Sequence, residues 1–183
     1  MITSDADILK LDVTIIDPNA FATPDRCPSV TLLAERPDEA LPRLGLDRHM
    51  AVLILTHDPK IDDRALSAAL RSDCFYIGAL GSRKSHAQRL ERLVAMGFTD
   101  ADLARLHVPI GISIGAVSPA EIAISILAEI IATLRYTGRT SEPRNLTRRA
   151  TDRQIIQPEW ICLSSLIHII GFPPVTAMVA PEM

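Results

Sequence analysis

Nearly uninterrupted apolar runs recur along the first half of the chain, and longer segments with helical spacing separate them. A strand whose successive residues are apolar, rather than alternately apolar and polar, is typical of a parallel sheet covered on both faces. The pattern predicts strands at residues 12–17, 30–34, 51–56 and 74–78.

The segments between these runs predict helices at residues 62–71 and 82–96, with a shorter one at 38–44. Apolar residues at helical spacing give each of the two longer segments one inward face. These inward residues are Ala65, Leu66, Ala69 and Leu70 in the first, and Ala87, Leu90, Leu93 and Val94 in the second. Gly97 follows the second helix, where a glycine commonly ends a helix.

A further helix is predicted at residues 122–134, where the start signal is the most complete in the chain. Ser118 stands at the N-cap, Pro119 at the first helical position and Glu121 three residues after the cap, which together form a capping box. Isoleucine and leucine residues lie on more than one face of this helix. It therefore lies centrally in the core or contributes to an oligomer surface.

The order of strands and helices predicts an α/β fold, a Rossmann-like, doubly wound and mostly parallel sheet formed by residues 1–138. Residues 139–183 are predicted to be an Arg-rich linker followed by an apolar C-terminal tail of no assigned role. The tail has no charge between residues 160 and 180, but Pro173-Pro174 would break a helix there. No membrane span is therefore expected.

Composition narrows the function classes. With 183 residues, of which 48% are hydrophobic, the chain can bury one sizeable core. A net charge of −3 without a local basic patch argues against nucleic-acid binding. The three cysteines are widely spaced and suggest neither a disulfide framework nor a metal site. Since a secretory signal is also lacking, we expect a cytoplasmic protein.

Candidate binding residues follow three of the predicted strands, because ligands of open α/β sheets bind beyond the carboxyl ends of strands. Asp17 ends the first strand and could accept hydrogen bonds from a ribose, or it could simply form a turn before Pro18. Thr56, His57 and Asp58 end the third strand. They offer a hydroxyl, an imidazole and a carboxylate to a polar ligand, with turn formation as the alternative.

The loop after the fourth predicted strand is a candidate anion site. Gly78 and Gly81 would let backbone amides approach an anion, and Ser82 would cap the next helix. Arg83 and Lys84 put cations in the first helical turn, where they oppose the helix dipole unless an anion binds. The alternative is that both cations are simply solvated at a surface helix end.

Several ordered motifs resemble the C-terminal Rossmann domain of the xanthine dehydrogenase accessory proteins, the XdhC and CoxI family. The resemblance extends over residues 11–138 and is specific, because the motifs occur in order along the chain. The motifs are VTIIDP at 13–18, FATP at 21–24, LTHDPK at 55–60, YIGALGSR at 76–83, PIGISIGA at 109–116, SPAEIA at 118–123 and ILAEI at 126–130.

The resemblance implies an accessory protein rather than an enzyme, with no catalytic or metal-ligating residues predicted. Such a protein binds the molybdenum cofactor, molybdopterin, during its sulfuration and passes it to a xanthine dehydrogenase-type molybdoenzyme. A cysteine desulfurase is a further candidate partner. The cofactor would contact Asp17, Thr56, His57, Asp58, Gly78, Gly81, Ser82 and Arg83. The alternatives are an NAD(P)-dependent oxidoreductase and a degenerate fragment that binds nothing.

The chain departs from the family at its start. Rossmann domains of this family begin with a strand and a G-x-G turn, whereas this chain enters at what corresponds to the second strand. We therefore expect an incomplete sheet that lacks its first strand and the glycine-rich turn, and so has unpaired edges. Self-association through such an edge, or through the helix at 122–134, would make the protein a homo-oligomer. Ser113 stands where relatives often carry an acidic residue, which argues against a catalytic or metal role there.

Overall fold

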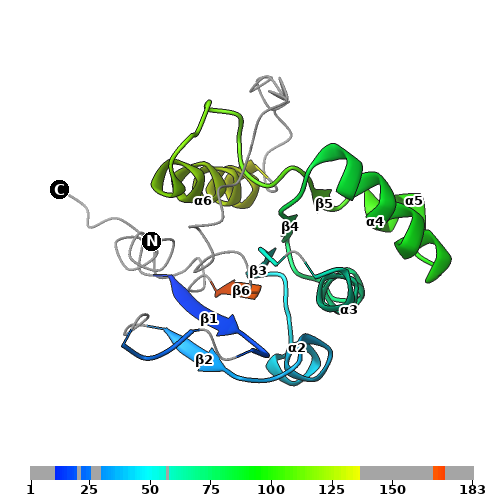
Figure 1. Cartoon of the computed structure of the whole chain (residues 1–183), viewed down its shortest axis with the longest axis horizontal. Helices are drawn as coiled ribbons and strands as arrows, with labels where there is room; N and C mark the ends of the chain where they lie inside the picture. The colour runs from blue at the N-terminus through cyan, green and yellow to red at the C-terminus, as the bar shows by residue number, and fades with distance from the viewer. Residues whose placement is uncertain (1–10, 20–21, 26–29, 57, 137–166, 172–183) are drawn as a thin grey trace.

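The computed structural model describes residues 11–19, 22–25, 30–56, 58–136 and 167–171. The strands are β1 (Asp12–Ile16), β2 (Thr31–Leu33), β3 (Met50–Ile54), β4 (Tyr76–Ala79), β5 (Leu106–His107) and β6 (Ile167–Gly171). The helices are α2 (Pro37–Leu44), α3 (Pro59–Leu70), α4 (Arg83–Ala95), α5 (Asp100–Leu103) and α6 (Pro119–Tyr136). They form one six-stranded sheet in the order β2-β1-β6-β3-β4-β5, with α6 apart from α2 and α3 (Figure 1). The predicted α/β, Rossmann-type fold is confirmed.

Strand β6 lies in the middle of this sheet. It runs antiparallel to both β1 and β3, so that Ile167 is opposite Ile16 on one side and Ile54 on the other. The other pairs, β1 with β2, β3 with β4 and β4 with β5, are parallel. In the doubly wound strand order 3-2-1-4-5-6, the place of β6 is that of the first strand.

The expectation of unpaired edges inside the sheet is therefore wrong. The inner edges of β1 and β3 are both hydrogen-bonded to β6. Strand β6 comes from the segment that the sequence sets apart as a tail, and it runs in the opposite direction to the strand whose place it takes. The predicted route to self-association through an open inner edge loses its basis.

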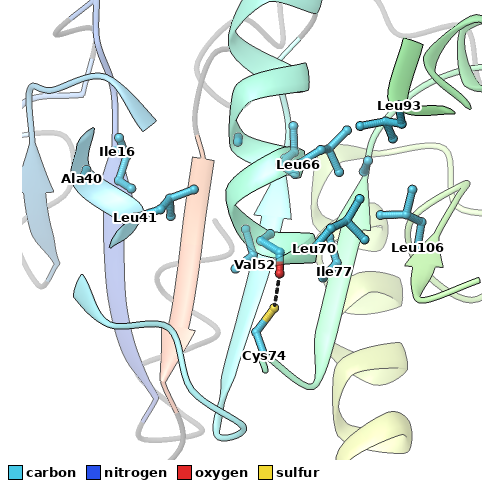
Figure 2. Packing of buried hydrophobic residues seen from close by; sticks show 14 residues of the cluster. Ile16, Ala40, Leu41, Val52, Leu66, Leu70, Cys74, Ile77, Leu93 and Leu106 are labelled. Atoms are coloured by element: carbon cyan, nitrogen blue, oxygen red, sulfur yellow. Dashed lines mark hydrogen bonds between the residues drawn. The ribbon is translucent and has the colours of Figure 1, made fainter. Parts of the chain in front are cut away.

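Apolar residues are buried on both faces of the sheet. On one face, Ile126 and Ile130 of α6 pack with a cluster that includes Ile15 of β1 and Leu53 of β3. On the other face, α2, α3 and α4 cover a second cluster. Figure 2 shows its centre, where Leu66 and Leu70 of α3 lie beside Val52 and Ile77. Burial of both faces explains the continuous apolar runs of the strands.

Helix α4 differs from its predicted packing. Leu93 is buried and Leu90 is partly buried, as predicted, but Ala87 is exposed and the Val94 side chain is 54% exposed. Helix α4 covers the β4 and β5 side of the sheet, so its buried stripe is narrow. Arg89, which the apolar pattern leaves out, occupies a buried position on this stripe.

The predicted start of α6 is confirmed. Ser118 Oγ accepts a hydrogen bond from the Glu121 amide at 3.3 Å, and Glu121 Oε2 accepts from the Ser118 amide at 2.8 Å. The Val117 amide also donates to Glu121, at 2.7 Å. These bonds satisfy the open amides of the first turn. Within the described ranges, no helix combines the length and apolar character that crossing a membrane requires.

Candidate functional site

The turn after β3 is held together by its own polar side chains. Thr56 is buried, and its Oγ1 donates a hydrogen bond to Asp62 Oδ1 and accepts one from the Asp58 amide at 3.2 Å. Asp58 caps α3 by accepting from the Lys60 amide at 2.9 Å. Helix α3 therefore begins at Pro59, three residues before the predicted start. His57 lies outside the described residues.

Asp17 also forms a turn. Its side chain is buried after the end of β1, where Oδ1 accepts from the Asn19 amide at 3.0 Å and Oδ2 accepts from the Ala22 amide at 2.7 Å. The turn interpretation of this residue is thus visible in the structure. Each carboxylate oxygen has a second lone pair, so the turn leaves Asp17 further acceptor capacity.

Gly78 is required for packing inside β4. A Cβ atom built on this residue would lie 2.5 Å from Ile110 Cδ1 and 2.7 Å from Tyr76 Cε1. Contacts this short would force these neighbours to shift. The structure thus places Gly78 in the α6-side core, and among the glycines predicted for the site only Gly81 lies in the loop between β4 and α4.

The N-terminus of α4 is open. Ser82 is the N-cap, and its Oγ accepts from the Ser85 amide at 3.2 Å, while the Leu80 amide pairs with Ile54 O at 2.9 Å. Among the residues that the structure describes, the amides of Gly81, Ser82 and Lys84 donate to no protein oxygen. The first turn of α4 contains no acidic residue. Its donors and its positive dipole end are thus available to an anion.

The buried side chain of Arg89 contacts this loop. Its side chain is 4% exposed, and Nη2 donates to Asp62 Oδ2 and to Leu80 O, both at 3.0 Å. Asp62 also accepts from Thr56, so one buried carboxylate connects the ends of β3 and β4. Arg89 was not predicted from the sequence, because its partner Asp62 lies 27 residues away in the chain.

A second polar cluster lies on the α6 side of the sheet. Glu129 of α6 accepts hydrogen bonds from Tyr76 Oη and from the Gly111 amide, both at 2.7 Å, and its Oε1 lies 3.1 Å from His107 Nδ1. Burial alone would raise the pKa of Glu129, but the bonds from His107, Tyr76 and Gly111 outweigh it and lower this pKa. Burial and the nearby Glu129 charge raise the pKa of Tyr76 well above its ordinary value.

This cluster joins three motifs that lie apart in the sequence. Tyr76 comes from YIGALGSR, Gly111 from PIGISIGA and Glu129 from ILAEI. The signal that could have found it is Glu129 itself, a glutamate between the buried residues Leu127 and Ile130 of α6. A charge in that position needs buried hydrogen-bond partners.

The sequence profile of the XdhC Rossmann domain matches residues 2–130. The chain belongs to this family. The matched span contains β1 to β5 and most of α6, and it ends before β6. The open amides of α4 and the Glu129 cluster thus both lie within the XdhC Rossmann domain.

Three curated proteins are similar to this chain. An uncharacterized Escherichia coli protein, YqeB, is 36% identical over 71% of this chain and 24% of its own length. The Escherichia coli molybdenum cofactor insertion chaperone PaoD is 35% identical over 46% of this chain and 27% of its own length. A Bacillus subtilis protein named as a probable xanthine dehydrogenase subunit is 32% identical over 56% of this chain and 29% of its own length. The chain thus spans about a quarter of these relatives.

A solved structure shares the fold. The crystal structure of a xanthine dehydrogenase from Bacillus halodurans superposes with a TM-score of 0.61 at 26% identity, over 79% of this chain and 41% of that one. This similarity in fold agrees with the family assignment.

Proposed function

We propose that this chain acts as an accessory protein in the maturation of a xanthine dehydrogenase-type molybdoenzyme. In this role it binds the molybdenum cofactor at the carboxyl edge of β3 and β4. The proposal is supported by the XdhC Rossmann domain match and by the names of two relatives, a molybdenum cofactor insertion chaperone and a probable xanthine dehydrogenase subunit. As part of the same proposal, the protein is cytoplasmic and forms a homo-oligomer. A cysteine desulfurase is its further partner.

The observation that carries this proposal is the open N-terminus of α4. Helices α2, α3, α5 and α6 each have an acidic residue in the first turn, and α4 has none. An anion at a helix N-terminus is stabilised by about 0.3–1 kcal/mol from the dipole alone, with hydrogen bonds to the free amides in addition. These donors fit the phosphate of molybdopterin.

In this proposal the other predicted residues contact other parts of the cofactor or support the site. Gly81, Ser82 and Arg83 would hold the phosphate, while Thr56, Asp58 and His57 follow the neighbouring strand β3 and Asp17 follows β1. Gly78 contributes indirectly by fixing β4 against Ile110. When bound, the cofactor supplies the molybdenum centre for the recipient enzyme. This chain's own residues bind and orient it.

A second candidate function is NAD(P)-dependent oxidation or reduction, because Asp17 ends β1, where a Rossmann domain commonly binds the ribose. Calorimetric titration of the protein with molybdopterin and with NADPH separates the two. Binding of molybdopterin with weaker or undetectable binding of NADPH supports the proposed function. Binding of NADPH alone supports the oxidoreductase, and binding of neither contradicts both.

The variant Ser85→Glu tests the site directly. It gives α4 the same cap spacing that Ser118 and Glu121 give α6, so that a carboxylate would occupy the open amides. We expect molybdopterin affinity to fall about tenfold or more, without loss of stability. Gln88→Glu adds the same charge one turn further along α4 and should leave the affinity unchanged. Equal affinities of Ser85→Glu and the parent would remove α4 from the proposed function.

A further inference from the structure

Three buried side-chain nitrogens in the described part of the chain have no hydrogen-bond partner. They are His86 Nδ1, Arg89 Nε and Arg89 Nη1. Both residues belong to the first two turns of α4 and stand three positions apart, so they share one side of the helix. A buried nitrogen without a partner destabilises a fold, so two such residues together are a feature that needs an explanation.

The Arg89 guanidinium lies against the loop between β4 and α4. A Cβ atom on Gly81 would lie 3.5 Å from Nη1 and 3.7 Å from Nη2, and Nη2 itself donates to the Leu80 carbonyl. Asp62 takes part of the Arg89 charge through Nη2 and leaves the Nε and Nη1 donors unused. Arg89 Nη1, one of the unused donors, therefore lies close to Gly81, whose amide is open.

We propose that His86 and Arg89 form, with the open amides of the α4 N-terminus, a binding site for a tetrahedral oxyanion of the phosphate type. The inference rests on the proposed function only for the identity of the larger ligand that carries the anion. Three side-chain nitrogens and at least two amides exceed the number of donors that a planar carboxylate, with two oxygens, can use well. A tetrahedral anion offers three or four oxygens in different directions, which suits donors on two sides.

The unused groups of the site are nitrogen donors, and this suits an anion better than a cation. Arg89 is always protonated and is paired with a single carboxylate, Asp62, while the next arginine on α4, Arg92, has its own partner in Asp63. Burial and the Arg89 charge lower the pKa of His86. The imidazole is therefore neutral near pH 7, and its Nδ1 can donate in the Nδ1–H tautomer.

Access requires a small movement, because the unused nitrogens are covered by the chain. Gly81 is the residue at which the loop can adjust, since its φ of +151° is a conformation that residues with a side chain rarely adopt. We expect the Gly81–Ser82 peptide to move outward as the anion enters, while Asp62 keeps Arg89 in place.

The test is calorimetric titration of the full chain with inorganic phosphate. Arg89→Gln and His86→Leu should each weaken phosphate binding about tenfold or more. The matched control is Arg92→Gln, which removes the neighbouring pair with Asp63 on the same two helices and should leave the affinity within about twofold. Absence of phosphate binding by the parent, or equal affinities of the parent and the two test variants, overturns the inference.

Arg89→Gln leaves Asp62 buried without its cation and can fail to fold. In that case His86→Leu, which breaks no ion pair, decides the result, together with the double variant Asp62→Asn/Arg89→Gln. Titration with molybdopterin separates the two proposals. Phosphate binding that depends on Arg89, without molybdopterin binding, keeps the anion site and contradicts the proposed function. Molybdopterin binding that is insensitive to both substitutions keeps the proposed function and contradicts the anion site.

Discussion

Tyr76 Oη donates a hydrogen bond to Glu129 Oε2 across 2.7 Å, although 53 residues separate the two in the chain. The bond joins the start of β4 to the middle of α6. Because the Gly111 amide and the His107 ring meet the same carboxylate, Glu129 also fixes the segment between β5 and α6. It thus holds the α6 layer in register with the sheet.

Replacement of this carboxylate should destabilise the fold. Glu129→Gln keeps the size of the side chain but removes its charge, and we expect the free energy of unfolding at pH 7 to fall by about 2 kcal/mol. Tyr76→Phe removes one donor and leaves two, so it should cost about 1 kcal/mol. Urea denaturation followed by circular dichroism measures both. Equal losses for the two variants would show that Glu129 does no more than accept the tyrosine bond.

The Glu129 contribution should also depend on pH in a defined direction. Its pKa in the folded state lies below the ordinary value, so its stabilising effect is present above the unfolded pKa of about 4.3. The effect is lost as the pH falls through the folded pKa. The difference in unfolding free energy between the parent and Glu129→Gln should thus be largest near pH 7 and shrink below about pH 4. A difference that stays constant down to about pH 3 would contradict the lowered pKa.

The contact between β4 and Ile110 predicts a coupled pair of substitutions. Gly78→Ala places a methyl group where Ile110 Cδ1 already lies, which should cost about 1–3 kcal/mol. Ile110→Ala alone should cost about 2–5 kcal/mol by leaving a cavity. In the double variant the new methyl group partly fills that cavity, so the combined loss should be at least about 1 kcal/mol smaller than the sum. Additive losses in urea denaturation would argue against the close approach.

Because β6 lies between β1 and β3, we expect this strand to be essential to the sheet. Ile169 is opposite Thr14 of β1 and Val52 of β3, so Ile169→Pro removes one ladder bond from a central strand. We expect a loss of about 2 kcal/mol or more and faster hydrogen exchange at amides of both β1 and β3. Ile169→Val keeps the backbone N–H and serves as the control. Unchanged exchange in the proline variant would show that β1 and β3 hold together without β6.

Ser85→Glu makes a stability prediction that does not depend on any ligand. A carboxylate at the third position of α4 completes a capping box and favours the dipole, so the free energy of unfolding should rise by about 0.5–1 kcal/mol. Thermal denaturation at low ionic strength measures the gain, and added salt should reduce it. A loss of stability would indicate that the open amides of α4 are already occupied.

The sequence predicted best what depends on local pattern. The strands β1, β2, β3 and β4 begin and end within two residues of their predicted bounds, and the capping box of Ser118 and Glu121 is present in full. Ser82 caps α4 as predicted. These features depend on residues a few positions apart, which a periodic pattern or a cap spacing contains.

Features that depend on residues far apart in the chain could not be predicted from local pattern. Strand β6 fills its place because β1 and β3 present facing rows of backbone groups, and nothing within residues 167–171 indicates which strands they will join. Arg89 is a polar position between the apolar residues of α4, and its burial follows from Asp62 on the preceding helix, which the local pattern does not contain. The short strand β5 and helix α5 were missed because neither has a run long enough to show a period.

The most direct test of the account is an NMR titration of the isotope-labelled protein with inorganic phosphate. The account predicts saturable shifts at the amides of Gly81, Ser82 and Lys84 and at the Arg89 side-chain NεH, with little change at Gly97 beyond the other end of α4. If phosphate leaves the α4 N-terminus unshifted, or shifts residues elsewhere instead, the central claim that this helix start binds the anion is contradicted.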